Sequence, residues 1–116
     1  MMESKYSIKH IGINNTTDVQ AQALANRISS VFCLERTSES PISIFVGSIF
    51  EVMKHNRRGA LGHIAIQTPN VELAMADLAK KGITFQEDTI RRDQDGRIIF
   101  VYLNQEFGGF AIHLTV

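Results

Sequence analysis

The sequence predicts an α+β domain built from two copies of one βαβββ module, whose strands form a single curved, mixed sheet. Three observations lead to this prediction. Residues 10–15 (HIGINN) resemble residues 63–68 (HIAIQT), an alanine-rich stretch follows each of them, and three short β-like runs follow each of those stretches. Because the elements come in the same order in both halves, the chain is best explained as a tandem repeat of one supersecondary unit.

The length and composition suit a single domain over residues 1–116. Hydrophobic residues make up 44% of the chain and charged residues 21%, which is ordinary globular usage and allows a core without disulfides. We expect the first module at about residues 6–54 and the second at about residues 61–116, joined by a short polar linker.

The charge balance and the cysteine content limit which binding partners and which cellular compartment we expect. The 12 basic and 12 acidic residues balance to a net charge of zero, without the basic excess of nucleic-acid-binding domains. No stretch approaches the ~20 apolar residues of a membrane span. The one cysteine, Cys33, cannot form an internal disulfide, which suits a reducing cytoplasm. Its place at an apolar helix end predicts a small buried side chain.

Each half contains one predicted helix, over residues 18–28 and residues 70–80. Both stretches combine good helix formers with apolar residues three or four apart. Thr17 or Asp18 can cap the first helix, and Asn70 can cap the second. The second stops where two lysines precede a glycine, a pattern typical of a helix C-terminus.

The remaining strands are short runs separated by turn residues. They are expected at residues 34–37, 42–46 and 48–53 in the first half, and at residues 84–91, 97–103 and 109–116 in the second. Pro41 and Gly47 separate the first set. Asp95 followed by Gly96 is a hairpin signal in the second set.

The first strand of each half sorts its residues by type, because side chains alternate between the two faces of a strand. Isoleucines occupy one face: Ile11, Ile13, Ile64 and Ile66. Small and polar residues occupy the other: His10, Gly12, Asn14, His63, Ala65 and Gln67. We expect the isoleucine faces to pack on the helices, and the opposite faces to form one concave ligand-binding surface.

Each half also ends in an apolar strand with one ionisable residue, Glu51 in the first and His113 in the second. A charged group is costly to bury without a partner. The cost is smaller if His10, Glu51, His63 and His113 share one cation, and this donor set suits Zn²⁺, Ni²⁺, Co²⁺, Mn²⁺ or Fe²⁺. The sequence therefore predicts one divalent metal ion at these residues. The alternative is that the histidines are hydrogen-bonded structural residues.

At these segments the chain resembles the vicinal oxygen chelate superfamily, which includes glyoxalase I, methylmalonyl-CoA epimerase, extradiol dioxygenases and the fosfomycin- and bleomycin-resistance proteins. The matching segments begin at Lys9 (KHIGI), Ile49 (IFEV), Gly62 (GHIAI) and Gly109 (GFAIHL). In metal-binding members the ligands come from the first, fourth, fifth and eighth strands. The resemblance therefore implies the same four ligands as the strand pattern.

A closer resemblance is to the glyoxalase-like domain fused to some bacterial 2-keto-3-deoxy-6-phosphogluconate or 4-hydroxy-2-oxoglutarate aldolases. The shared strings begin at Lys9 (KHIGIN), Glu51 (EVMK), Gly62 (GHIAI) and Gly108 (GGFAIHL). This implies a sugar-acid or 2-oxo-acid context. In glyoxalase I the last-strand ligand is a glutamate implicated in proton transfer, whereas this chain has His113, which argues against glyoxalase I activity itself.

The resemblance implies a metal-dependent isomerase, epimerase or lyase that acts on a small 2-oxo or hydroxy acid through two adjacent oxygens. Glu51 or His113 would move the proton, while His10 and His63 hold the metal. Two other functions stay open here. One is a non-catalytic module that binds a small ligand or serves an aldolase. The other is a structural interaction domain, which leaves the four ionisable residues unexplained.

The remaining predictions concern the ligand and the oligomer. We expect Asn14, Gln67 and Tyr102 to bind a small anionic substrate, although Tyr102 could instead lie at the edge of the core. The basic runs 54–58 and 91–92 are expected to be solvated, the alternative being that they attract an anion. Relatives of this size often form dimers, so we expect a homodimer with sites within one chain or shared between two.

Overall fold

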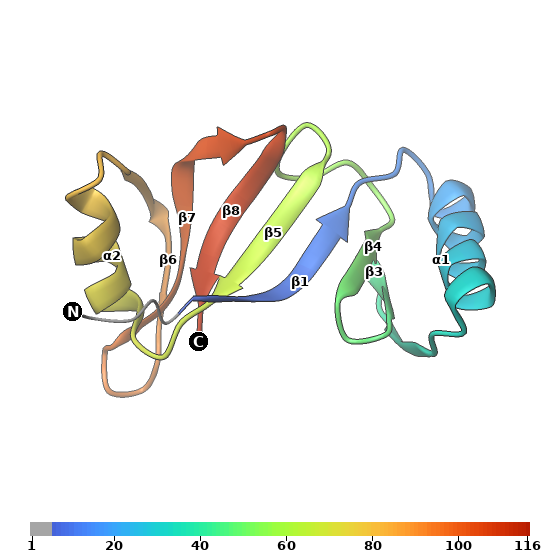
Figure 1. Ribbon diagram of the computed structural model, residues 1–116, viewed down its shortest axis with the longest axis horizontal. Helices are drawn as coiled ribbons and strands as arrows, with labels where there is room; N and C mark the ends of the chain where they lie inside the picture. The colour runs from blue at the N-terminus through green and yellow to red at the C-terminus, as the bar shows by residue number, and fades with distance from the viewer. Residues whose placement is uncertain (1–5) are drawn as a thin grey trace.

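The computed structural model describes residues 6–116, which form one eight-stranded sheet and two helices (Figure 1). The elements are β1 (Ser7–Ile13), α1 (Asp18–Phe32), β2 (Arg36–Glu39), β3 (Ser43–Val46), β4 (Phe50–Met53), β5 (Gly62–Gln67), α2 (Val71–Ala79), β6 (Phe85–Arg92), β7 (Ile98–Phe107) and β8 (Phe110–Thr115). The strand order is β2-β3-β4-β1-β5-β8-β7-β6. This architecture confirms the predicted α+β fold of two βαβββ units in one mixed sheet.

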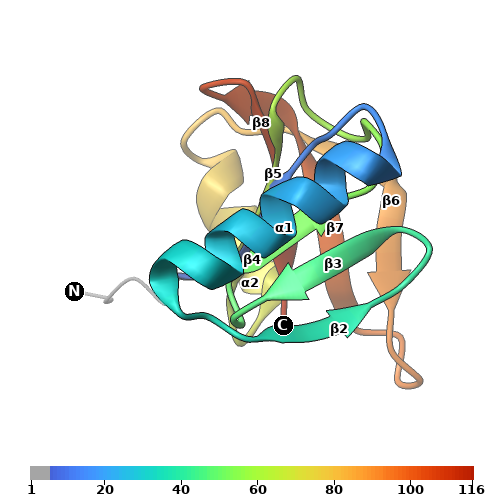
Figure 2. The ribbon, with the colours of Figure 1, turned by 90° about the vertical axis from the view of Figure 1, so that its right-hand side faces the viewer.

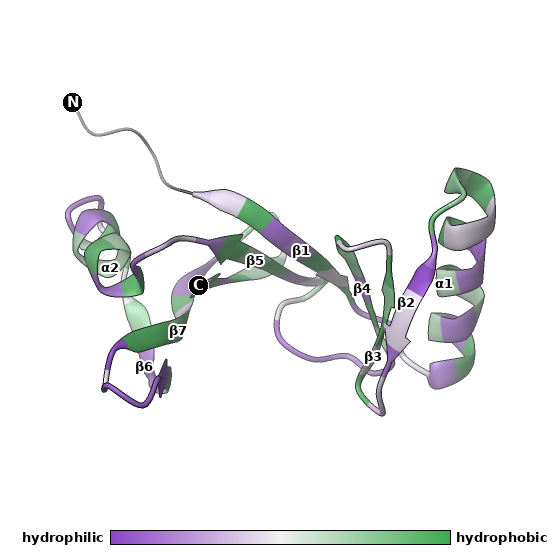
Figure 3. Ribbon diagram, turned by 90° about the horizontal axis from the view of Figure 1, so that it is seen from below, coloured by the Kyte–Doolittle hydropathy of each residue, from purple (hydrophilic) through white to green (hydrophobic). Residues whose placement is uncertain are grey.

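The two halves meet at the centre of the sheet. Strands β1 and β5 pair antiparallel with each other, β1 pairs in parallel with β4, and β5 pairs in parallel with β8. The helices lie at opposite ends of the molecule (Figures 1 and 3). Helix α1 packs mainly on β3 and β4 (Figure 2), and α2 on β7 and β8. No helix within residues 6–116 is long and apolar enough to span a membrane.

Each helix is held by its own hydrophobic core. The first core consists of Ala21, Ala25, Ile28, Ile44, Val46 and Val52. The second consists of Val71, Ala74, Val101, Leu103, Ile112 and Leu114.

The expectation that the isoleucine faces of β1 and β5 pack on the helices holds in part. Ile64 and Ile66 pack against the second core, whereas within residues 6–116 Ile11 and Ile13 are half-buried and belong to neither core. The reason is that α1 covers β3 and β4 and leaves β1 largely uncovered.

Helix α1 extends further than predicted and ends at Cys33. This residue terminates the helix in the left-handed conformation, with a φ of 55°, and its side chain is exposed. The prediction of a buried cysteine was therefore wrong, because Cys33 lies beyond the buried stripe of the helix. At the other end, Thr17 rather than Asp18 is the cap. Its Oγ1 accepts a hydrogen bond from the Gln20 amide at 3.2 Å.

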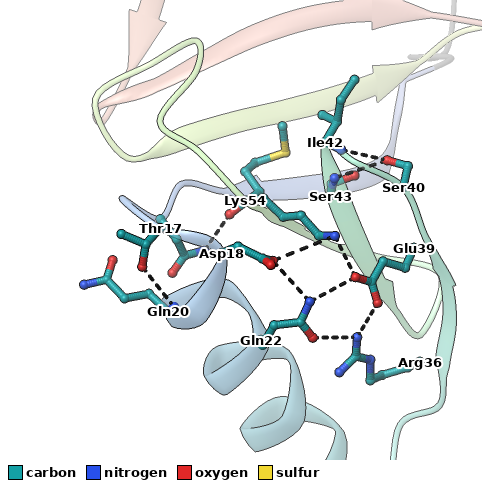
Figure 4. Close-up of polar contacts among 12 residues, drawn as sticks. Thr17, Asp18, Gln20, Gln22, Arg36, Glu39, Ser40, Ile42, Ser43 and Lys54 are labelled. Carbon is teal, nitrogen blue, oxygen red and sulfur yellow. Dashed lines mark hydrogen bonds and ion pairs between the residues drawn. The ribbon is translucent and has the colours of Figure 1, made fainter.

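A polar network ties α1 to β2 and to the residue that follows β4 (Figure 4). The Lys54 amine pairs with Glu39 at 2.6 Å and lies 3.8 Å from Asp18. Gln22 donates to Asp18 and Glu39, and Arg36 donates to Gln22 and Glu39. The hydrogen bonds from Lys54 and Gln22 hold the pKa of Glu39 below its ordinary value. Lys54 is thus a buried structural residue and not the solvated side chain that its basic run predicted.

Candidate metal centre

Two rows of side chains cross the middle of the sheet on one face. The rows are Glu51–Gly12–His63 and His10–Ala65–His113, as the pairing of β4, β1, β5 and β8 dictates. In each row a small residue lies between two ionisable ones. Exchanging β1 with β5 maps one row onto the other, so the repeat in the sequence becomes an approximate twofold symmetry of the site.

His10 shares this face because β1 contains a bulge. Ile8 pairs with Ile66 and His10 pairs with Ala65, so Lys9 is an extra residue in the strand. Strict alternation would put Ile8 and His10 on the same face. The bulge instead lets Ile8 lie beside Ile66 on the opposite, apolar face while His10 stays beside Ala65.

The ionisable side chains of both rows converge on one point. His10 Nε2 lies 3.3 Å from His63 Nε2. Glu51 Oε1 lies 3.3 Å from His10 Nε2 and 3.0 Å from His63 Nε2. One ring nitrogen from each of His10, His63 and His113 lies within 4.8 Å of the other two. All four predicted ligand residues are therefore brought together within a single chain.

The spacing of these donor atoms suits one divalent ion. Atoms bound tetrahedrally to Zn²⁺ at about 2.0–2.1 Å lie about 3.3 Å from one another, close to the separations among His10, His63 and Glu51. Two imidazole nitrogens facing each other need a proton or a cation between them. Within residues 6–116, His113 Nδ1 is buried and has no hydrogen-bond partner. One ring nitrogen of His113 lies within 4.8 Å of those of His10 and His63, and imidazole with carboxylate is a donor set for Zn²⁺ and its neighbours.

Burial lowers the pKa of two of the imidazoles. Desolvation lowers the pKa of His10, and the charge of Glu51 opposes this only in part. Desolvation, reinforced by the charges of His63 and His10, lowers the pKa of His113 to about 3. Because only a neutral imidazole binds a metal ion, His10 and His113 are available as ligands at neutral pH.

Ser43 orients Glu51 within the centre. The buried Ser43 Oγ donates to Glu51 Oε2 at 2.7 Å, which leaves Oε1 directed at the histidines. Burial alone raises the pKa of Glu51. The hydrogen bonds from His63 and Ser43, with the charges of His63 and His10, outweigh burial, so the pKa lies below its ordinary value. Glu51 is therefore an ionised carboxylate held in one orientation.

We expect Ser43→Ala to weaken divalent-metal binding by about tenfold or more, since partners that orient metal ligands typically contribute 10–100-fold. The dissociation constant for Zn²⁺ can be measured by competition with a chromophoric chelator. Ser48→Ala, at an exposed serine of the same half, is the matched control. Unchanged affinity in Ser43→Ala would show that Glu51 does not depend on this hydrogen bond.

The candidate metal ligands line a cavity of about 440 Å³. His63 and His113 are buried in it, whereas Arg57, Arg58 and Arg91 line it with exposed side chains. Their exposure agrees with the expectation that these basic runs are solvated, and the structure adds that the three arginines line the cavity. The linker and β6 bring them to the same cavity, which local sequence cannot indicate.

The predicted substrate-binding residues separate into two groups. Tyr102 lines the cavity, with its ring 5.0 Å from that of His113, and burial raises its pKa. Asn14 lies past the end of β1, where its amide donates to the carbonyl of Gly59 at 3.0 Å. Gln67 is exposed at the far end of β5. Asn14 and Gln67 therefore lie outside this cavity, since alternation gives the face of a residue but not its position along the strand.

Two further residues of the site carry no recognisable signal in the sequence. Ser43 comes next to Glu51 only through the antiparallel register of β3 with β4, in which Phe45 pairs with Glu51. Phe100 lies with its ring 4.4 Å from that of His113. A serine and a phenylalanine in apolar strands read as ordinary core residues until that register is known.

Comparison with known proteins finds similarity in structure. No protein-family model matches the chain, and no curated protein matches it by sequence. Methylmalonyl-CoA epimerase from Mycobacterium tuberculosis superposes with a TM-score of 0.66 at 13% identity, over 99% of this chain and 91% of that one. A variant of the Streptomyces coelicolor methylmalonyl-CoA epimerase, in complex with 2-nitronate-propionyl-CoA, gives 0.64 at 19% identity, over 96% and 94%.

A hypothetical protein from Bacillus halodurans gives a TM-score of 0.66 at 13% identity, over 97% of this chain and 94% of that one. At such identities the similarity is one of fold. It extends over nearly the whole length of each chain and includes both βαβββ units. The chain therefore has the fold of the vicinal oxygen chelate proteins.

Proposed function

We propose that the chain is a divalent-metal-dependent isomerase or epimerase of a small 2-oxo or hydroxy acid. The observation that carries this proposal is the convergence of three imidazoles and Glu51 on one point of a cavity. Such a cluster of buried and half-buried ionisable groups is costly to the fold, and groups of this kind concentrate at functional sites. The likeness in fold to epimerases supports the isomerase class over the lyase class that the sequence also allowed.

In this proposal His10 and His63 hold the metal from the two central strands, and Glu51 and His113 complete the set. A bound divalent ion supplies a Lewis acid that stabilises negative charge on a substrate oxygen. Burial of His63 and His113 keeps bulk water from this part of the cavity, which strengthens every charge interaction within it. The neutral Tyr102 phenol can donate a hydrogen bond to the substrate.

The proposed catalytic pair is Glu51 and His113, because they lie on opposite flanks of the central strands. Glu51 is on β4 beside β1, and His113 is on β8 beside β5. A substrate bound over β1 and β5 would have one proton-transfer group on each side. Epimerisation by two groups uses such an arrangement: the ionised Glu51 takes a proton from one face of a carbon, and the N–H of the neutral His113 ring gives one to the opposite face. Proton exchange with solvent then restores both groups.

Hydrogen exchange next to a carbonyl tests the proposal. Protein loaded with Zn²⁺, Ni²⁺, Co²⁺ or Mn²⁺ would be incubated in heavy water with 2-oxobutyrate or 2-oxoglutarate and followed by proton NMR. We expect exchange that requires the metal and stops with a chelator. Glu51→Gln and His113→Gln should slow it by about 100-fold or more, with metal content measured in each. His55→Gln, at an exposed histidine outside the cavity, should not.

The other outcomes separate the two parts of the proposal. Metal-dependent binding of these acids without any exchange would overturn the catalytic role. It would favour a non-catalytic binding module, such as one that serves an aldolase. Failure to take up any of the four metals would overturn the metal centre as well.

We also propose that the chain forms a homodimer through the apolar face of the sheet. Ile8 is 55% exposed and Phe107 is 52% exposed. Phe107 lines an apolar cavity of about 240 Å³ together with Ile66, the partner of Ile8 in the sheet. Exposed apolar patches of this kind mark interfaces. Light scattering should give the mass of a dimer for the wild type and the mass of a monomer for Ile8→Arg. A wild type that is monomeric at all concentrations would overturn the proposal.

A further inference from the structure

The cavity over the candidate metal centre carries an excess of positive charge. Lys9, Arg57, Arg58 and Arg91 line it, and among the described residues Glu51 is its one carboxylate. No ion pair within residues 6–116 includes any of the three arginines. Lys9 differs from them in that its amine donates to the carbonyl of Val116 at 3.0 Å. The three guanidinium groups are therefore uncompensated cations at one cavity.

Arg58 is held in place from two sides. Its Cζ lies 4.4 Å from the centroid of the Tyr102 ring, and its Nη1 donates to Gln86 Oε1 at 2.5 Å. The Gln86 amide in turn donates to the carbonyl of Leu103 at 3.2 Å. A guanidinium that is already stacked and hydrogen-bonded loses little further freedom when it binds an anion. Arg58 is thus pre-organised.

Arg91 of β6 stacks in a similar way on the aromatic ring next to Tyr102. Its Cζ lies 4.5 Å from the centroid of the Phe100 ring, which lies 5.5 Å from that of Tyr102. The Phe100 and Tyr102 rings both contact His113, with centroids 4.4 Å and 5.0 Å from it. Each of Arg58 and Arg91 is therefore separated from the His113 ring of the metal centre by one aromatic ring.

The three arginines act on the same region of the cavity. All three line the cavity that contains Tyr102 and His113. Arg58 and Arg91 stack on the Tyr102 and Phe100 rings, whose centroids lie 5.5 Å apart. Overlapping positive fields in a hollow attract an anion more strongly than isolated charges on an open surface.

We propose that Arg57, Arg58 and Arg91 bind a second anionic group of the substrate, at the end away from the metal centre. This inference rests on the proposed function and narrows its substrate class to 2-oxo or 2-hydroxy acids with a phosphate or a second carboxylate at the far end. Guanidinium groups bind both anions through charge-assisted, bidentate hydrogen bonds. An acid without the second anion leaves the three positive charges unpaired.

Two matched pairs of acids test this inference by binding rather than by activity. Calorimetric titration of Mn²⁺-loaded protein would compare 3-phosphoglycerate with glycerate, which differ by one phosphate. It would also compare 2-oxoglutarate with 2-oxobutyrate, which differ by one carboxylate. We expect the doubly anionic member of at least one pair to bind about tenfold tighter or more. The pair with the larger ratio identifies the anion.

Arginine variants assign the preference to residues. In the double variant Arg58→Ala with Arg91→Ala, the ratio within each pair should fall to about one, while the affinities for Mn²⁺, glycerate and 2-oxobutyrate are unchanged. Arg27→Ala, at an exposed arginine of α1, removes the same charge elsewhere and should keep the full ratio. Unchanged Mn²⁺ affinity also shows that each variant is folded.

The outcomes distinguish this inference from the proposed function. Equal affinities within both pairs, with metal-dependent binding of glycerate or 2-oxobutyrate intact, would overturn the second anion site and leave the proposed function standing. A preference that survives the double variant would overturn the assignment to these arginines. If all four acids bind with the same affinity in the presence and in the absence of the metal, the proposed function is overturned instead.

Discussion

Replacing His63 by alanine is expected to abolish stoichiometric binding of a divalent ion. His63 Nε2 lies 3.0 Å from Glu51 Oε1 and 3.3 Å from His10 Nε2. Its loss removes one donor and leaves His10 Nε2, at 3.3 Å, as the imidazole nitrogen beside Glu51 Oε1. We expect the dissociation constant to rise by at least about 100-fold, beyond the effect of losing a residue that only orients a ligand.

Elemental analysis with chelator competition measures this effect. The wild type should hold about one ion per chain after reconstitution, and His63→Ala should hold none after dialysis. His55→Ala is the matched control, because that histidine is exposed and does not line the cavity. The metal should also raise the melting temperature of the wild type and the control, since it binds only the native state. Full metal content in His63→Ala would remove His63 from the centre.

The second large effect is expected from Gly12→Ala, although alanine adds only one methyl group. A Cβ at Gly12 would lie 2.1 Å from His63 Cε1 and 2.3 Å from His63 Nδ1. These separations are far below van der Waals contact, so the imidazole must leave its position. We expect destabilisation by about 1–3 kcal/mol in urea unfolding, typical of overpacking at a well-packed site. Metal affinity should fall with it, because His63 no longer meets Glu51 and His10.

A double-mutant cycle isolates the cause of this effect. In a His63→Ala background the ring is absent, so Gly12→Ala should cost far less in free energy of unfolding than it does in the wild type. The coupling energy between the two positions would then account for most of the single-variant effect. An equal cost in both backgrounds would mean that Gly12 is needed for backbone reasons and not for the space of the imidazole.

The features that the sequence determined by itself are those that depend on neighbours along the chain. The repeat of residues 10–15 at 63–68 predicted two like units, and helical periodicity placed both helices. Alternation along the strands separated Ile64 and Ile66 from His63, and the structure agrees on that division. The same alternation selected the four candidate metal ligands, because a repeat-related ionisable residue in an apolar strand is conspicuous against its neighbours.

Alternation failed where the answer depended on a second strand. It could not detect the bulge at Lys9, which puts Ile8 and His10 on opposite faces. It grouped Asn14 and Gln67 with the histidines, although both lie near strand ends and outside the cavity. The face of the sheet on which a side chain lies depends on its own strand. Whether that side chain reaches a cavity depends on how several strands are staggered.

Only the tertiary structure decided what surrounds the four ligands. Ser43 reaches Glu51 across the register of β3 and β4, Arg58 comes from the linker, and Arg91 comes from the edge strand β6. The sequence did determine that ionisable residues would gather on one face of the central strands. It could not determine their partners, because hydrogen bonds and stacking between distant segments depend on distances that exist only after the sheet has assembled.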